Sequence, residues 1–210
     1  MAATDEMALQ DRPRTLSGIE TAIHQCRRCP IGFLDNQAVM GEGLKKSALM
    51  VVGEQPGDQE DLAGKPFVGP SGQLLNRYME QAGIDRRQVY VTNAVKHFKF
   101  AWRGKRRLHQ SPTSGEIDTC RFWLDGERSI IQPQLILALG ASAARGVLGK
   151  AVTISKSRGH AVPLDDGAEL WITVHPSYLL RLKDEMKREQ ERLFRADLAA
   201  VAERLAQLAG

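Results

Sequence analysis

Short apolar runs alternate along this 210-residue chain with longer segments whose apolar residues recur at helical spacing. Each run is rich in Val, Ile and Leu and is followed closely by glycine or polar residues. Such continuous apolar runs are typical of strands buried on both faces of a parallel sheet. The pattern predicts four strands, at residues 47–53, 88–95, 134–140 and 169–174.

The segments between these runs predict helices. Residues 15–28 and 71–83 have helical spacing, and Gly83 is a natural end for the second. Thr113 and Glu116 have the spacing of a capping box that opens a helix running to Ile131. A short helix is expected at 142–149, and the charged tail from about Tyr178 carries one apolar stripe. Alternating strands and helices predict a three-layer α/β/α sandwich around a mostly parallel central sheet.

The length and composition predict a single domain covering residues 1–210. Residues 1–14 are polar and are expected to be flexible. We find neither a secretory signal nor a run of 18 apolar residues, so we expect a soluble, cytoplasmic protein that does not contact membranes. No obligate protein partner is evident, and we expect a monomer.

Three polar segments follow predicted strands. Glu54 comes after the first strand, Asn93 closes the second, and His175 follows the last. In open α/β sheets the carboxyl edge is where ligands bind, so these side chains are expected to share a pocket. Each also has an ordinary structural explanation: Glu54 as a helix cap, Asn93 as a turn residue, and His175 as a packed side chain.

Residues 53–72 are dense in glycine and proline, which predicts a shaped loop rather than a helix or strand. The loop lacks the Gly-Lys-Ser/Thr ending of a phosphate loop and the glycine spacing of a dinucleotide fold. Within it, Phe67 is a candidate stacking surface for a flat ligand, and a core position is the alternative.

A stretch between Asp85 and Glu116 contains no acidic residue. The protein has a formal net charge of +4, and this one-sided stretch favours a polyanionic partner such as nucleic acid. A solvated basic face is the alternative explanation. The basic residues in the stretch are Arg86, Arg87, Lys96, Lys99, Arg103, Lys105, Arg106 and Arg107.

Three cysteines are too few for a complete disulfide framework. Cys26 and Cys29 form a Cys-x-x-Cys pair, which points to a metal or redox centre, and Cys120 is the third thiol. Three thiolates leave a tetrahedral site one ligand short, and a histidine is the natural fourth.

Taken together, the motifs resemble the iron-sulfur branch of the uracil-DNA glycosylase superfamily. They are Gly53-Glu54-Gln55-Pro56-Gly57, Gly64-Lys65-Pro66-Phe67-Val68-Gly69, Asn93-Ala94-Val95-Lys96 and His175-Pro176-Ser177. They stand in the family's order, and the resemblance extends from Cys26 to about Arg181.

The resemblance implies an enzyme that removes uracil from DNA. Phe67 would stack on uracil, Asn93 would bind its polar edge, and Gln55 and Gly57 would line the pocket with backbone groups. His175 would stabilise the departing base as an oxyanion-hole donor does. Glu54 would act beside the sugar.

Ordinary members of the branch hold a 4Fe-4S cluster with four cysteines. Here His97 stands at the third position, so the resemblance implies Cys26, Cys29, His97 and Cys120 as ligands of a structural cluster. By spacing alone, a Cys3His zinc site remains open.

Residues 98–110 form a longer stretch than the family usually has there, and Lys105-Arg106-Arg107-Leu108-His109 resembles the motif of UdgX. Members of that subgroup become covalently attached to the DNA on which they act, which implies that His109 bonds the abasic sugar. Single-stranded DNA is the expected substrate. The expected phosphate contacts are Lys96, Lys105, Arg106, Arg107, Ser177 and Arg181.

Two alternatives remain open from the sequence. One is an ordinary turnover uracil-DNA glycosylase in which the long stretch only binds DNA. The other is a non-catalytic nucleic-acid-binding module held together by zinc.

Overall fold

The computed structural model describes residues 12–209, so most of the N-terminal segment 1–14, which was expected to be flexible, lies outside the described residues. Five strands form the main sheet in the order β2-β1-β5-β7-β6. Strands β2, β1, β5 and β7 are parallel, and only β6 runs antiparallel to its neighbour. This confirms the predicted α/β class. The main-sheet strands are β1 (Leu49–Gly53), β2 (Tyr90–Asn93), β5 (Leu135–Leu139), β6 (Val162–Pro163) and β7 (Glu169–Thr173).

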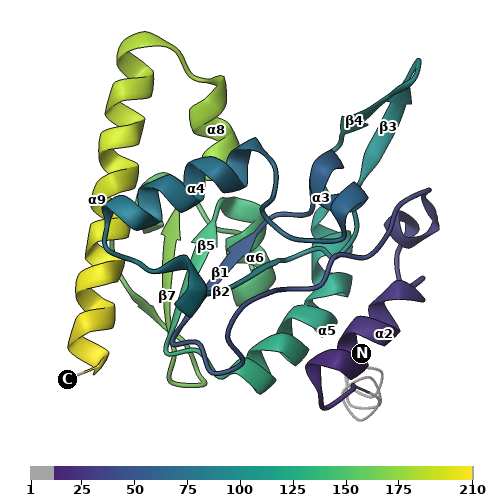
Figure 1. The fold of residues 1–210 in the computed structure, drawn as a ribbon, viewed down its shortest axis with the longest axis horizontal. Helices are drawn as coiled ribbons and strands as arrows, with labels where there is room; N and C mark the ends of the chain where they lie inside the picture. Colours follow the sequence, from purple (N-terminus) through teal and green to yellow (C-terminus); the bar gives the residue numbers. More distant parts are fainter. Residues whose placement is uncertain (1–11, 210) are drawn as a thin grey trace.

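Helices cover both faces of the sheet (Figure 1). The helical elements are α2 (Leu16–His24), η1 (Pro30–Phe33), α3 (Asp58–Ala63), α4 (Pro70–Gln81), η2 (Arg86–Gln88), α5 (Ser114–Ile131), α6 (Ala141–Leu148), α7 (Ile154–Ser157), α8 (Pro176–Arg181) and α9 (Asp184–Ala209). No helix within residues 12–209 combines the length and apolarity needed to cross a membrane.

Alternate residues of β1 point into two separate cores. Val51 packs in the core that α4, α8 and α9 cover, where the Phe194 ring meets Tyr78 edge-on at 5.5 Å. Met50 and Val52 face the opposite core, against α5 and α6. This division follows from the two-residue period of a strand and explains why the central strands are apolar throughout.

The expectation that residues 53–72 contain no helix is wrong, because α3 occupies part of this loop. Its first turn carries Asp58, Glu60 and Asp61, which suit the positive end of a helix. Glu60 also accepts hydrogen bonds from the backbone N–H groups of Gly57 at 3.0 Å and Gly69 at 2.9 Å. One buried carboxylate therefore ties both ends of the loop to the helix.

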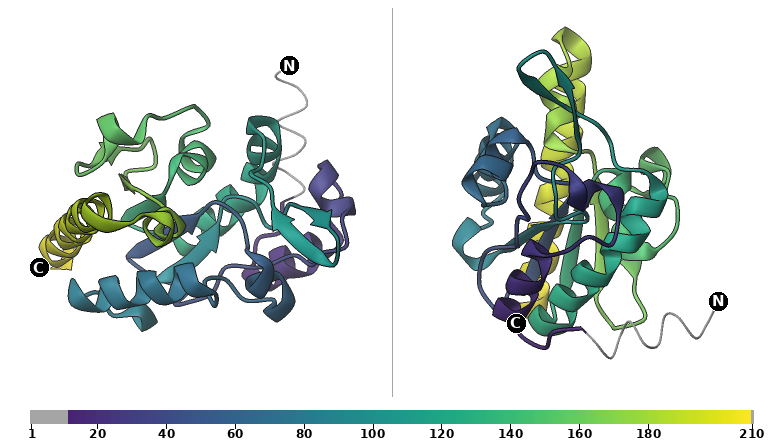
Figure 2. Two further views of the ribbon diagram at one scale, coloured as in Figure 1. Left: turned by 90° about the horizontal axis from the view of Figure 1, so that it is seen from above. Right: turned by 90° about the vertical axis from the view of Figure 1, so that its right-hand side faces the viewer.

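The basic stretch that follows β2 is a β-hairpin rather than a plain loop. Strands β3 (Phe100–Arg103) and β4 (Arg106–His109) pair antiparallel around Gly104, whose φ of 61° suits glycine. The hairpin projects away from the main sheet, close to α3, as Figures 1 and 2 show. His109 is the last residue of β4, and the hairpin places it near the carboxyl edge of the main sheet.

Candidate active site

The carboxyl ends of the parallel strands gather the predicted site residues around one cavity. Gly53 at the end of β1 lies beside Asn93 of β2, and Leu139 of β5 lies beside Thr173 of β7. The cavity has a volume of about 650 Å³. Its lining includes residues singled out from the sequence: Glu54, Gln55, Gly57, Phe67, Asn93, His109, His175, Ser177 and Arg181.

Glu54 lies between two partners in this cavity. Its Oε2 accepts a hydrogen bond from the Ser142 hydroxyl at 2.5 Å, and its Oε1 lies 3.3 Å from Nε2 of His109. Burial opposes ionisation of Glu54, but hydrogen bonds from His109 and Ser142 outweigh it and lower the pKa below the ordinary value. The cavity therefore holds a carboxylate that stays charged at neutral pH and is aimed at an imidazole.

Sequence reasoning missed Ser142. Its signal was available, because it follows the strand predicted at 134–140 and so stands at the same sheet edge as Glu54 and His175. A serine near the start of a helix is ordinarily explained as a cap. The contact of Ser142 with Glu54 is seen only in the folded structure.

His175 is held as a neutral hydrogen-bond donor. Burial is the main cause that lowers its pKa to about 4, so the ring is uncharged at neutral pH. The backbone N–H of Ser177 donates to its Nδ1 at 3.2 Å. Because Nδ1 accepts, the ring proton of the neutral form belongs on Nε2.

Phe67 and Asn93 meet beside Gly53. A Cβ atom at residue 53 would collide with Oδ1 of Asn93 and with the Phe67 ring, so glycine is what lets these two side chains approach the end of β1. Phe67 itself has a φ of 58°, an uncommon value for a bulky residue. The site thus places an aromatic ring and an amide side by side in the cavity wall.

Gln55 uses its side chain to hold the base of the hairpin. Its Nε2 donates to the carbonyl oxygen of Gln110 at 3.0 Å, and its Oε1 accepts from the N–H of Lys99 at 3.1 Å. The expectation that Gln55 and Gly57 contact a ligand through backbone groups stays a prediction.

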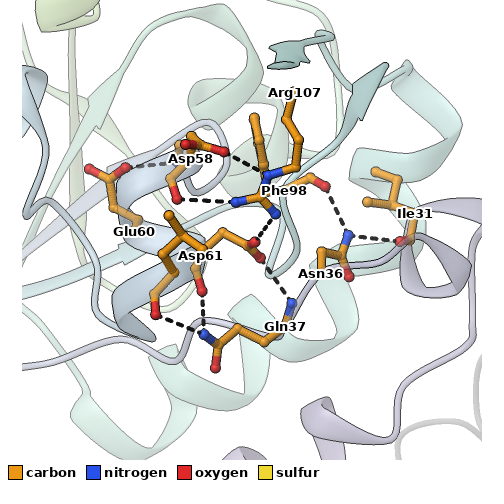
Figure 3. Close-up of polar contacts among 10 residues, drawn as sticks. Ile31, Asn36, Gln37, Asp58, Glu60, Asp61, Phe98 and Arg107 are labelled. Carbon is orange, nitrogen blue, oxygen red and sulfur yellow. Dashed lines mark hydrogen bonds and ion pairs between the residues drawn. The ribbon is translucent and has the colours of Figure 1, made fainter. Parts of the chain in front are cut away.

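Arg107 anchors the hairpin to α3. Its guanidinium lies 2.7 Å from Asp58 and 2.5 Å from Asp61, and it stacks over Phe98 and Phe100 at 5.5 and 5.1 Å from the ring centroids. Figure 3 shows how this side chain reaches down to both carboxylates. Asp58 and Asp61 are the partners of Arg107 in this structure, and its contact with a phosphate stays a prediction.

Asn36 and Gln37, in the segment before β1, connect this segment to α3 and to the base of the hairpin. The backbone N–H of Gln37 donates to Asp61 at 2.9 Å, while the Asn36 side chain donates to the carbonyl oxygens of Phe98 at 2.8 Å and Ile31 at 3.0 Å (Figure 3). The hairpin, α3 and the segment before β1 are therefore joined through one polar network.

Lys96 was also predicted to contact DNA, and the structure contradicts this. Its side chain is 0% exposed, and its Nζ lies 2.5 Å from Glu127 on α5. It also donates to the Asn93 carbonyl oxygen at 2.8 Å. A buried cation with these partners is unavailable to a phosphate, and it instead ties the backbone of Asn93 to α5.

The other predicted phosphate contacts are placed where DNA can reach them. Lys105 and Arg106 are exposed at the turn end of the hairpin. Arg181 donates to the Ser177 hydroxyl at 3.3 Å on α8, next to His175. Their role in DNA binding stays a prediction.

The three cysteines do not line this cavity, and all three pack in or against one hydrophobic cluster. Cys26, Cys29 and Cys120 belong to one cluster with α2 and α5, and Sγ atoms accept from Trp123 Nε1 and from the Lys96 backbone N–H, both at 3.3 Å. N–H groups directed at sulfur and a set of thiols are what an iron-sulfur or zinc site needs.

The fourth candidate ligand is buried close by. His97 pairs with Ala38, a member of the same cluster, and burial followed by the charge of Arg27 lowers its pKa to about 4. A neutral imidazole is the form that ligates metal. The types of these four donors fit the predicted centre. Within residues 12–209, no three such side chains are grouped closely enough to hold a metal ion.

Comparison with known proteins places this chain in a family. Residues 40–199 match the uracil DNA glycosylase superfamily. The chain is 35% identical over 179 residues to a type-4 uracil-DNA glycosylase of Thermotoga maritima, covering 84% of this chain and 90% of that protein. A type-4 uracil-DNA glycosylase of Pyrobaculum aerophilum is 33% identical over 191 residues, which is 88% of this chain and 91% of that protein.

A type-4 uracil-DNA glycosylase of Archaeoglobus fulgidus is 30% identical over 188 residues, covering 86% of this chain and 90% of that protein. The chain therefore belongs to the uracil-DNA glycosylase superfamily, which confirms the resemblance at that level. These relatives carry the type-4 name, so the resemblance to UdgX rests on residues 105–109 and is taken up under the proposed function.

The first prediction concerns the anchor of the hairpin. Replacing Arg107 with Met leaves the nearly buried Asp61 carboxylate without its cation, which typically costs about 1–3 kcal/mol. We expect amide hydrogen exchange in residues 100–109 to accelerate roughly 5- to 100-fold. The exposed control Lys105→Met is expected to exchange as the wild type does. Equal protection in Arg107→Met and wild type would show that Arg107 is not the anchor.

The second prediction concerns the neutral state of His175. The unfolded chain protonates this histidine near its usual pKa of 6.5 and the folded chain only near 4, so the unfolded state binds more protons between these values. Stability should therefore fall as the pH is lowered through this window. Urea unfolding should show wild type losing about 1–3 kcal/mol more than His175→Asn between about pH 7 and pH 4. Parallel losses in the two proteins would mean that His175 is not held neutral.

Proposed function

We propose that this protein is a uracil-DNA glycosylase that excises uracil and then bonds the abasic sugar through His109. The observation that carries the proposal is the 3.3 Å approach of His109 Nε2 to the Glu54 carboxylate at the cavity wall. The superfamily membership and the type-4 relatives support the first half of the proposal. The position of the hairpin supports the second.

Uracil reaches the cavity only after it leaves the base stack. Extrusion from a duplex costs a few kcal/mol, and a single strand avoids that cost. We therefore propose single-stranded DNA as the preferred substrate. Lys105, Arg106 and Arg181 are the exposed or cavity-lining cations that would hold its phosphates.

In the cavity, Phe67 stacks on uracil and the Asn93 amide pairs with its polar edge. Cytosine presents the reversed donor and acceptor pattern at that edge, so it would leave Asn93 unpaired in a buried place. The ion pair of Lys96 with Glu127 keeps the Asn93 backbone in position from behind.

Cleavage of the bond between C1′ and N1 sends its electron pair to uracil. The neutral His175, with its proton on Nε2, donates to the anion that forms, while the Glu54 carboxylate faces the oxocarbenium-like sugar. Neither group needs to change its protonation state for this step at neutral pH.

His109 then takes the place that water occupies in a turnover enzyme. The ring nitrogen with the free lone pair bonds C1′, and the other ring nitrogen passes its proton to Glu54. The product is a neutral imidazole attached to the sugar, with uracil released. Ser142 keeps Glu54 oriented for this transfer.

We further propose that Cys26, Cys29, His97 and Cys120 hold a 4Fe-4S cluster. The cluster would supply a cross-link between the 26–29 segment, the residues after β2 and α5. It lies apart from the uracil cavity, so the proposal gives it a structural role.

The third prediction tests capture. Wild-type protein mixed with a uracil-containing single strand should give a band that survives heat and detergent, while a thymine strand gives none. His109→Ser removes the nucleophile and leaves space for water, so we expect adduct yield to fall at least about 100-fold while uracil release continues. A heat-stable band formed by His109→Ser would contradict the assignment. Alkali-labile strands without an adduct in wild type would identify a turnover glycosylase.

The fourth prediction tests the metal centre. The purified protein should be brown, absorb light broadly at about 400 nm and contain ~4 iron atoms per chain. Cys120→Ser should lose most of the iron, whereas His97→Cys restores an all-cysteine set and should keep it. A colourless protein with one zinc ion would overturn the cluster and favour the zinc-held alternative.

A further inference from the structure

The hairpin presents an aromatic side chain to solvent. Trp102 on β3 is 59% exposed, although it is one of the largest apolar side chains in the protein. Its neighbour across the hairpin, Arg107, turns toward Asp58 and Asp61 and leaves the indole uncovered. An exposed aromatic ring on a paired strand offers a stacking surface for a flat ligand.

Trp102 shares a face of the hairpin with His109. Phe100 is paired with His109, and Trp102 stands two residues further along the same strand. Side chains two residues apart lie on one face, about 7 Å from each other. The Phe100 ring meets the indole edge-on at 5.4 Å and so fixes its direction. The Trp102 indole therefore lies on the same face of the hairpin as His109, diagonally across the two strands from it.

The indole lies beside exposed cations and an open cavity. Arg103, Lys105 and Arg106 are exposed at the end of the hairpin. Three carboxylates, those of Asp35, Asp58 and Asp61, share a cavity with the indole, and the last two are already paired with Arg107. A second cavity, of about 810 Å³, lies here, and Trp102, Leu62 and Leu108 are among its lining residues. There is room against the indole for a flat ring.

An aromatic platform beside cations is the combination that binds single-stranded nucleic acid, because bases stack on the ring while the cations hold the phosphates. Lysine is depleted at the centres of protein–protein interfaces, which makes a protein partner the poorer fit. The distance from His109 further restricts the ligand, since a base here belongs to a nucleotide close to the one in the uracil cavity.

We propose that Trp102 stacks on the base of a nucleotide adjacent to the extruded uracil, with Lys105 and Arg106 on the neighbouring phosphates. This inference rests on the proposed function, because it takes DNA as the substrate. It adds a second recognition point outside the uracil cavity and makes the hairpin a clamp on the strand as well as the carrier of His109.

The test begins with binding to DNA that contains no uracil. Fluorescence anisotropy with a labelled single-stranded oligothymidylate should show Kd rising about 5- to 100-fold in Trp102→Ala, because stacking on one base is lost. Trp102→Phe keeps a ring and should stay within about threefold of wild type. Phe33→Ala, at an aromatic residue that is 71% exposed and belongs to η1 rather than to the hairpin, is the matched control and should bind as wild type does.

A second measurement locates the base. Uracil-containing strands are made with a tetrahydrofuran abasic residue on the 5′ or the 3′ side of uracil, and uracil release is followed at limiting protein. Wild type should slow at least about fivefold when one of these two bases is missing, whereas Trp102→Ala should show no further loss. The position at which loss of the base slows uracil release, 5′ or 3′ of uracil, identifies the nucleotide that stacks on Trp102.

The outcomes separate this inference from the proposed function. If wild type binds DNA and releases uracil but Trp102→Ala matches it in both assays, the stacking inference is wrong and the proposed function stands. If wild type releases no uracil, the proposed function fails, and the oligothymidylate Kd alone decides whether Trp102 binds bases.

Discussion

The ion pairs of Arg107 with Asp58 and Asp61 are the contacts on which the site depends. His109 sits on a two-stranded hairpin that projects from the sheet, and such a hairpin is marginally stable alone. Arg107 connects it to α3, and Gln55 holds its base through the backbone of Lys99 and Gln110. Without these anchors, nothing else in the pairing of β3 with β4 would keep the imidazole close to Glu54.

The anchor also explains why a short helix interrupts a glycine-rich loop. Helix α3 presents Asp58 and Asp61 toward the hairpin, while Glu60 binds the amides of Gly57 and Gly69. The same turn therefore shapes one side of the uracil cavity and holds the hairpin on the other. Ionised Glu54 and neutral His175 both line this cavity, with pKa values set apart by hydrogen bonding in one case and burial in the other.

Much of the fold could be predicted because its signals are local. The four apolar runs became β1, β2, β5 and β7, and Thr113 with Glu116 forms the predicted capping box. Helix α3 was missed because glycine and proline around it suggested a loop, although the backbone N–H groups of Gly57 and Gly69 bind Glu60 and stabilise the helix. The hairpin was missed because β4 is almost entirely exposed and polar, so it lacks the alternation that marks a half-buried strand.

In the site, too, the residues with local signals could be predicted and those with distant partners could not. Side chains placed by strand ends, such as Glu54, Asn93 and His175, were predictable from the order of the elements. Lys96 was misassigned, and the internal partners of Arg107 were missed, because a cation in a basic stretch looks available until its partners are known. Their partners, Glu127 and the α3 carboxylates, lie 31 and more than 45 residues away along the chain. Ser142 was overlooked because a serine near a helix start suggests a cap, and its contact with Glu54 spans 88 residues.

The central claim is that the hairpin carries His109 to the sugar of the nucleotide from which uracil has left. The most direct measurement is peptide mass spectrometry on the denatured protein–DNA adduct after protease and nuclease digestion. The account predicts one modified peptide, with the deoxyribose remnant on His109 and unmodified His175. A remnant on any other residue, or an adduct that forms with thymine strands as readily as with uracil strands, would contradict it.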